Sequence, residues 1–533
     1  MVGIDKDAVE RYLATPAAYG LPASTPVERI DTHISVIFLA GPHAYKLKKR
    51  VDLVYLDFTT LDARREACKR ELMLNQRTAP SLYLDIVPVT ETGDGLVLGE
   101  NTDGTIVDWV VKMARFDQCN LLSHMADRGE LTVAMVEKLA RQLERFHKNA
   151  EVSRTDGGQA RFVEILESNQ KNFYPFIGKI YPPSLIERLG SFYADTLEAL
   201  SGLIESRRAS GWVRHCHGDL HLNNVVCLNG EPVPFDCIEF NDQFACIDAL
   251  YDFAFLLMDL AFRAQSDRRL AAHANAALNA YLQAQSPEDL SETLKGLEAL
   301  PFFMSVRASV RSHVSARMSR GAKSGASELE GFALAYAEFA EDLLRERKAR
   351  LYAVGGLSGT GKTTIAKRLA PELGGSIGAV HLRTDIIRKR LAGVADFDRL
   401  SSDAYTQAAS DQVYAEMARL ASVALDAGQT VICDAVFAKP VERTLIEQVA
   451  TSRSVPFEGI WLTAPPKMLE SRVEQRSQAG TDASDADERV VRLQLSYDLG
   501  DLSWTVVEAV GEPDRVCANA RTALNLTLPS SEN

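Results

Sequence analysis

The nine residues GLSGTGKTT (356–364) constrain the fold most, because G-x-x-x-x-G-K-[ST] needs a strand before it and a helix after it. The apolar run LYAVGG (351–356) precedes this loop, and TIAKRLA (364–370), which favours a helix, follows it. In such a P-loop, backbone N–H groups wrap phosphates, the lysine reaches the terminal phosphates and the hydroxyl ligates magnesium. The sequence therefore predicts ATP and Mg²⁺ here, with Thr363 on the metal and the nucleotide held by Gly356, Ser358, Gly359, Thr360, Gly361, Lys362, Thr363 and Thr364.

Two acids follow later apolar runs that read as strands. Asp385 comes after AVHLRT (379–384), and Asp434 comes after TVIC (430–433). The carboxyl ends of strands in an open parallel sheet face the ligand crevice, so both acids are expected to converge on the P-loop. The alternation of strands and helices past about residue 348 predicts a parallel sheet covered on both faces.

The segment TDIIR (384–388) resembles the T-D-x-x-R of P-loop kinases related to gluconate kinase, zeta toxin and phage polynucleotide kinase. By this resemblance Asp385 orients or deprotonates the accepting hydroxyl, and Arg388 binds the substrate or its phosphate. Asp434 resembles the Walker B acid and is expected to hold the metal, or to face the substrate instead. Arg443 lies at a position that is often basic in such kinases. An equally favoured alternative is that Arg443 is an ordinary solvent-exposed charge on a helix.

Basic residues also precede the acidic stretch SQAGTDASDADER (477–489), which reads as a mobile lid. Arg472 and Arg476 are four residues apart and so share one helix face. Lid arginines of small P-loop kinases close on the transferred phosphate, and we predict that catalytic role for Arg476. A plain surface charge is the alternative.

A second, unrelated phosphate signature is HGDLHLNN (217–224) followed by FDCIEF (235–240). Asp219 and Asn224 are five residues apart, and Asp236 follows at the end of an apolar strand. This is the spacing of a kinase catalytic loop and its metal-binding acid. One carboxylate must face the attacking hydroxyl, while an amide oxygen and a second carboxylate hold magnesium against the phosphates.

These residues resemble the aminoglycoside phosphotransferase and choline kinase-like superfamily, whose mark is H-G-D-x-x-x-x-N. The resemblance implies that Asp219 is the catalytic base and that Asn224 and Asp236 are magnesium ligands, with Glu239 in the second acidic motif. The acids of IDALYDFAFLLMD, Asp248 and Asp252, are expected to brace the loop rather than touch substrate, and His217 and His221 are expected to be structural.

Members of that superfamily also need a strand lysine on the nucleotide phosphates and a helix glutamate paired with it. Ala44 and Lys46 have the spacing that puts both on one strand face, so Lys46 is the predicted lysine and Lys48 the second choice. Glu71 is the predicted partner, with Glu66 behind it. A basic edge strand is the alternative reading of KLKKR.

The segment DTHIS (31–35) lies where a Gly-rich loop would cover the phosphates, yet it holds no glycine. Because of this departure, an inactive pseudokinase stays an alternative interpretation. The joint presence of Asp219, Asn224 and Asp236 argues against it.

Strand-like patterns fill residues 30–115, with a helix at 61–80, and helical periodicity dominates after 130. A charged helix at 331–350 runs into LYAVGG. The sequence thus predicts an α+β bilobal kinase-like domain at 1–348, with lobes at about 1–118 and 119–348. An α/β P-loop NTPase domain with a parallel sheet is predicted at 349–533.

The composition argues against several classes of binding partner. The net charge of -13 argues against a dedicated nucleic-acid binder. The charged N-terminus and the lack of a long apolar run predict a cytoplasmic chain without membrane contact. The eight cysteines show no C-x-x-C pairs, so buried thiols are favoured over a zinc site.

Together the two signatures predict a bifunctional kinase that uses ATP and Mg²⁺ to phosphorylate a hydroxyl of one or two small-molecule substrates. Two alternatives stay open: one domain is a regulatory ATP-binding or pseudokinase module, or the P-loop domain phosphorylates 5'-hydroxyl ends of polynucleotides. The acceptors, a sequential action of the two sites and the oligomeric state are not readable from the sequence.

Overall fold

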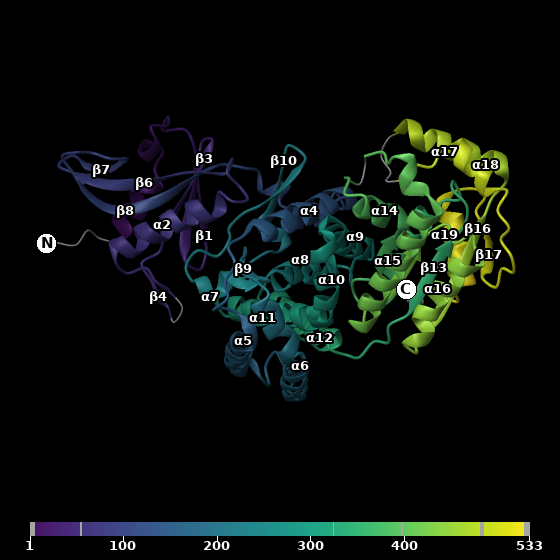
Figure 1. Ribbon diagram of the computed structural model, residues 1–533. Coiled ribbons are helices and arrows are strands. Elements are labelled where there is room, and N and C mark those ends of the chain that lie inside the picture. The colour runs from purple at the N-terminus through teal and green to yellow at the C-terminus, as the bar shows by residue number, and fades with distance from the viewer. Residues whose placement is uncertain (1–5, 54–55, 323, 396–397, 480–483, 527–533) are drawn as a thin grey trace. The chain divides into compact units, whose positions relative to one another are not determined.

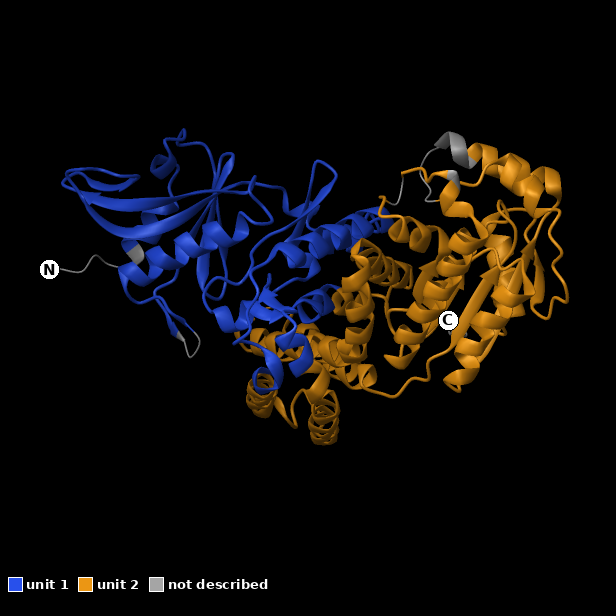
Figure 2. Ribbon diagram, viewed as in Figure 1, with its two compact units in different colours: residues 1–162, 205–256 blue, residues 163–204, 257–533 orange. Residues whose placement is uncertain are grey.

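A computed structural model describes residues 6–53, 56–322, 324–395, 398–479 and 484–526 (Figure 1). The chain forms two compact units, coloured separately in Figure 2. Unit 1 comprises residues 1–162 and 205–256, and unit 2 comprises residues 163–204 and 257–533. The domain boundary predicted near residue 348 lies within unit 2, and it stays a prediction.

Unit 1 is built on a six-stranded antiparallel sheet. Its strands, in spatial order, are β1 (Val27–Asp31), β2 (Ser35–Ala40), β3 (His43–Lys48), β8 (Thr105–Ala114), β6 (Tyr83–Thr92) and β7 (Gly95–Leu98). Unit 1 also contains three two-stranded sheets. They pair β4 (Asp52–Leu53) with β5 (Leu56–Asp57), β9 (Val213–His215) with β12 (Cys246–Asp248), and β10 (Val225–Leu228) with β11 (Glu231–Pro234). The strands predicted from alternation between residues 33 and 116 are therefore confirmed.

The alternation along β3 separates two apolar clusters. Ala44 packs in a cluster with Trp109, whereas Tyr45 and Leu47 pack in another with Phe38. Successive side chains of a strand point to opposite faces, so Lys46 shares the face of Ala44, as its spacing predicts.

The helices of unit 1 are α1 (Lys6–Leu13), α2 (Leu61–Asn75), α3 (Leu122–Asp127), α4 (Val133–Asn149) and α7 (Asp242–Ala245). Three helices run through both units: α5 (Gly158–Phe173), α6 (Pro183–Ala209) and α8 (Ala249–Arg263). Helix α2 starts at Thr60, whose hydroxyl accepts the N–H of Ala63. Its buried face carries Ala67, Cys68 and Glu71, and this face determines the direction of the Glu71 carboxylate.

Unit 2 contains a five-stranded parallel sheet, in the spatial order β14 (Val380–Arg383), β15 (Val431–Asp434), β13 (Leu351–Gly355), β16 (Phe457–Thr463) and β17 (Thr505–Glu508). All five residues of β13 are buried, as expected for a central parallel strand covered on both faces. The predicted parallel sheet is confirmed, and the P-loop leaves from its middle strand.

The helices of unit 2 are α9 (Arg269–Ala284), α10 (Pro287–Gly296), α11 (Leu300–Gly321), α12 (Ala326–Leu343), α13 (Lys362–Leu369), α14 (Thr384–Leu391), α15 (Gln407–Asp426), α16 (Pro440–Ser452), α17 (Pro466–Ala479), α18 (Glu488–Gln494) and α19 (Pro513–Ala523). The helix predicted at 331–350 was too long, because α12 ends at Leu343. The segment RERKAR (345–350) has five charged residues and one alanine, so it offers little apolar surface to a buried helix face.

Helix α9 covers the outer edge of β14, whose backbone would otherwise lack partners on that side. Asn279 accepts the N–H of His381 at 2.7 Å and donates to the carbonyl of Ala379 at 3.1 Å. Asn275 donates to the carbonyls of Ile377 and Ala379 at 2.8 and 3.0 Å. Two asparagines thus replace a neighbouring strand.

We expect Asn279→Ala to lower the free energy of unfolding by about 1–3 kcal/mol, because the buried N–H of His381 loses its acceptor. Urea denaturation of the full chain measures the change. Asn149→Ala, at an exposed helix end, is the control and should stay within about 0.5 kcal/mol of wild type. Equal stability of the two variants would contradict this account of the sheet edge.

Candidate functional sites

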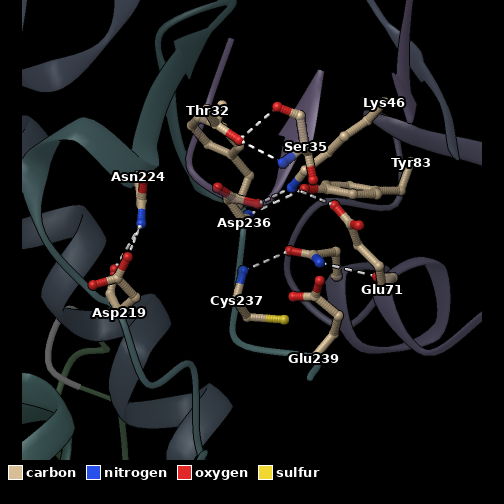
Figure 3. A network of polar contacts seen from close by, with 12 residues as sticks. Thr32, Ser35, Lys46, Glu71, Tyr83, Asp219, Asn224, Asp236, Cys237 and Glu239 are labelled. Carbon is tan, nitrogen blue, oxygen red and sulfur yellow. Dashed lines mark hydrogen bonds and ion pairs between the residues drawn. The ribbon is translucent and has the colours of Figure 1, made fainter. Parts of the chain in front are cut away.

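The catalytic-loop residues of unit 1 meet as their spacing predicts. The amide nitrogen of Asn224 donates to the carboxylate and to the backbone carbonyl of Asp219, both at 2.9 Å (Figure 3). Because the nitrogen is used in this way, the amide oxygen of Asn224 is left for a cation. The Asp219 side chain is 40% exposed, so it can face a hydroxyl.

The side chain of Asp252 holds the catalytic loop by hydrogen bonds. Its carboxylate accepts the N–H groups of His217 at 3.1 Å and Gly218 at 2.8 Å, and His147 bonds to it at 3.0 Å. The bracing role predicted for Asp252 is therefore confirmed. His147, which completes this arrangement, was missed, since a lone histidine in a helix gives no motif.

The other predicted bracing acid has a different partner. Asp248 forms a two-pronged ion pair with Arg207, at 2.7 and 2.8 Å, and so does not hold the loop itself. His217 bonds to the carbonyl of Phe235 at 2.9 Å, and burial lowers its pKa. A buried, neutral His217 fits the structural role expected of it.

His147, Cys216 and Asp252 also lie close enough together to suggest a metal site, with ligand atoms within 4.8 Å of one another. The carboxylate of Asp252 already serves two backbone N–H groups and His147, however. Burial raises the pKa of the Cys216 thiol well above its ordinary value. The group therefore reads as the brace of the loop, and the buried thiol favoured from the sequence fits it.

An ion network joins the buried strand lysine and helix glutamate to the partly exposed first acid of the second acidic motif (Figure 3). Lys46 donates to Glu71 at 2.7 Å and to Asp236 at 2.6 Å. Burial alone would lower the pKa of Lys46, but the carboxylates of Asp236 and Glu71 raise it well above its ordinary value. The lysine is thus held charged. Glu66, the second choice for its partner, is 63% exposed and pairs with Lys69 instead.

Lys48 extends this network in a way that the sequence did not indicate. Its side chain is fully buried and pairs with Glu71 at 2.5 Å and with Glu239. Burial raises the pKa of Glu71, but the charges of Lys46 and Lys48 outweigh it and lower that pKa to about 2. Two lysines therefore hold one glutamate ionised, and the alternative of an exposed basic edge strand is wrong for these two residues.

We expect Lys48→Ala to destabilise the protein by about 3–5 kcal/mol, because it leaves two buried carboxylates without their shared cation. Chemical denaturation followed by circular dichroism measures this. Lys69→Ala removes an exposed pair and should change stability by less than about 1 kcal/mol. A Lys48→Ala variant as stable as the Lys69→Ala variant would show that the buried pairs contribute nothing.

The segment without glycine forms a tight turn between β1 and β2. The Thr32 hydroxyl accepts the N–H of Ser35 and donates to its carbonyl, both at 3.0 Å. Hydrogen bonds of a side chain therefore close the turn, which needs no glycine.

The P-loop of unit 2 requires its glycines. Gly356 and Gly359 have φ angles of 140° and 86°, a region that other residues rarely adopt. A Cβ atom would lie 2.5 Å from the carbonyl of Leu462 at the first position and 2.6 Å from that of Leu469 at the second. The loop therefore passes too close to neighbouring backbone for any side chain.

The predicted metal pair of the P-loop is in contact. The Thr363 hydroxyl donates to the Asp434 carboxylate at 2.6 Å, and His381 and Arg383 lie 3.6 Å from the same carboxylate. Burial raises the pKa of Asp434, but His381, Arg383 and Lys362 lower it to about 2. A hydroxyl beside an ionised carboxylate offers the oxygen ligands that Mg²⁺ prefers, so the residues fit this ion.

A cavity of about 630 Å³ opens over the P-loop. Its walls include residues 358–365 of the loop and helix, together with Asp385, Arg388 and Asp434. The Asp385 carboxylate has no hydrogen bond or ion pair with any residue that the structure describes. It therefore remains available to a ligand.

Arg388 is in the cavity wall but is already engaged. It donates to the carbonyl of Ala404 at 2.6 Å, and its guanidinium lies over the ring of Tyr405 at 5.0 Å. Arg443 is buried and donates to four backbone carbonyls, so the alternative of a solvated helix residue is wrong. Its likeness to a basic position of such kinases stays a prediction.

The lid prediction falls partly outside the described residues. Residues 480–483 and the side chain of Arg476 are not described, so its catalytic role stays a prediction. Arg472, on the same helix, donates to the carbonyl of Ala509 at 3.1 Å and to that of Gly359 at 3.5 Å. Arg472 therefore supports the P-loop, and it also lines the cavity over the loop.

Two family models match parts of the chain. Residues 103–287 match the phosphotransferase enzyme family, and residues 351–497 match an AAA domain. The fold class is therefore a kinase-like phosphotransferase domain followed by a P-loop domain with a parallel sheet, as predicted. Both matches support phosphotransfer as the class of activity. Lys46 and Glu71 precede the first match, and the site assignments stay predictions.

Two of the relatives match this chain over most of its length. Uncharacterized proteins of Mycobacterium tuberculosis and Mycobacterium bovis are each 29% identical over 462 residues, which covers 85% of this chain and 87% of theirs.

Among solved structures, a choline/ethanolamine kinase family protein from Mesorhizobium loti aligns at 11% identity. This alignment covers 63% of this chain and 94% of that one, with a TM-score of 0.37. A sugar kinase from a Janibacter species aligns at 22% identity over 34% of this chain and 96% of its own, with a TM-score of 0.25.

Among the described residues, no helix is both long enough and apolar enough to cross a bilayer.

Proposed function

We propose that the chain transfers the γ-phosphoryl group of ATP to a hydroxyl of a small molecule, with magnesium, at two separate sites. The cavity over the P-loop carries this proposal, because Lys362, the Thr363–Asp434 pair and the unbonded Asp385 all line it. Phosphate, metal and accepting hydroxyl would each meet a suitable group there.

At the P-loop site, Lys362 and the backbone N–H groups bind the outer phosphates, and Thr363 with Asp434 would hold magnesium. The ion supplies charge neutralisation across the phosphates when it is bound. Asp385 orients the acceptor hydroxyl and takes its proton as the oxygen–phosphorus bond forms and the bond to the ADP oxygen breaks.

At the first site, Asp219 accepts the proton of the acceptor hydroxyl, and Asn224 with Asp236 would hold magnesium. Lys46 holds the phosphates, and Glu71 keeps this lysine in place. The hydrogen bond between Asn224 and Asp219 supports these roles, because it links the acceptor end of the site to the metal end.

The test is a screen of a metabolite extract with γ-labelled ATP, run on wild type, Asp219→Asn and Lys362→Ala. Distinct labelled products that depend on distinct sites support two enzymes on one chain. If one variant leaves every product unchanged, its domain is regulatory or inactive. A parallel arm with 5'-hydroxyl oligonucleotides at moderate salt tests the alternative acceptor, which the net charge of -13 disfavours.

A further inference from the structure

The last residue of α18, Gln494, reaches into the P-loop. Its side-chain oxygen accepts the N–H of Ser358 at 2.8 Å. Ser358 is 7% exposed and Gln494 is 8% exposed, and both line the cavity over the loop. A residue 136 positions away along the chain therefore occupies one of the backbone N–H groups of the phosphate-binding motif.

This bond fixes the direction of the Gln494 amide. A backbone N–H only donates, so its partner must be the amide oxygen, and the NH₂ group must point the other way. That nitrogen makes no hydrogen bond to any residue that the structure describes. The nearly buried Gln494 amide is thus held at its oxygen, and the two N–H groups of its nitrogen can donate to a ligand in the cavity.

The position along the loop indicates which phosphate lies nearby. A P-loop lysine serves the β- and γ-phosphates. Lys362 places its amine 3.0 Å from the carbonyl of Leu357, the residue directly before Ser358. Gln494 is therefore bonded to the end of the loop where the terminal phosphates bind.

We propose that Gln494 donates a hydrogen bond to the terminal phosphate of ATP, so that the P-loop site distinguishes ATP from ADP. This inference rests on the proposed function of that site and adds to it a residue that touches the transferred group. Such a donor favours the triphosphate and holds its outer phosphorus against the acceptor side of the cavity.

Binding of Mg-ATP and Mg-ADP to the full chain, measured by calorimetry, tests the proposal without knowledge of the acceptor. The P-loop component is the binding that Lys362→Ala removes. In Gln494→Ala this component should weaken about ten-fold or more for ATP and stay within about two-fold for ADP. Arg492→Ala, on the same helix with a side chain 64% exposed, should change neither.

Gln494→Glu separates the ligand contact from the structural bond. The carboxylate of this variant still accepts the N–H of Ser358, but it has no donor and repels phosphate. The affinity for ATP should therefore fall at least as much as in Gln494→Ala. Equal losses for ATP and ADP in Gln494→Ala, with normal binding in Gln494→Glu, would mean that the residue only holds the loop, and the inference would be wrong. If Lys362→Ala removes no binding at all, the proposed function of this site fails, and the inference fails with it.

Discussion

Asp219→Asn should slow phosphoryl transfer at the first site by about 100- to 10,000-fold, the usual contribution of a general base. Asparagine keeps an oxygen that accepts the amide of Asn224, now bonded to the Asp219 carboxylate at 2.9 Å, but it cannot take a proton. Binding of Mg-ATP should change little, because Lys46, Glu71 and Asp236 are untouched.

The measurement is the initial rate of each labelled product formed from the extract, with Mg-ATP affinity measured alongside. Asp103→Asn, in an exposed loop, is the matched control and should behave as wild type. Unchanged rates for every product in Asp219→Asn would rule out the catalytic role of this carboxylate. A loss of nucleotide binding equal to the loss of rate would assign Asp219 to binding instead.

Lys362→Ala should lower phosphoryl transfer at the P-loop site by about 100- to 1,000-fold, the cost of removing one preorganised donor to developing charge. Its amine now donates to the carbonyl of Leu357 at 3.0 Å, next to the Thr363–Asp434 pair. Lys362 is one of the charges that lower the pKa of the buried Asp434 carboxylate, so the stability of the variant is measured together with its activity. A loss of activity at an unchanged melting temperature would report the site and not unfolding.

Product rates and thermal unfolding of the same preparation provide the check. Lys367→Ala, an exposed lysine on the same helix, is the control and should keep full activity. Lys362 would have no role in transfer if Lys362→Ala kept its products, and none could be assigned to it if the melting temperature fell enough to explain the loss.

The sequence predicted the contacts that lie within motifs. Asp219 and Asn224 are five residues apart, and the loop that joins them brings the two side chains together. Lys46 and Glu71 are 25 residues apart, but strand alternation and the buried face of α2 define where each points. The parallel sheet likewise followed from apolar runs that end in acids.

The contacts that the sequence did not predict join segments without a motif of their own. His147 meets Asp252 across 105 residues, and Gln494 meets Ser358 across 136. Lys48 was read as the second choice for the role of Lys46, whereas it is a separate, fully buried partner of Glu71 and Glu239. Such pairings depend on tertiary packing, which residue spacing alone does not encode.

We propose that two independent sites on this chain each transfer a phosphoryl group. The most direct measurement compares labelled products from one extract across wild type, Asp219→Asn, Lys362→Ala and the double variant. We expect each single variant to lose a different labelled product. If the two sites act in sequence, the variant of the later site should instead accumulate the product of the earlier one. The double variant should lose all labelled products. Identical product profiles in wild type and either single variant would contradict the proposal.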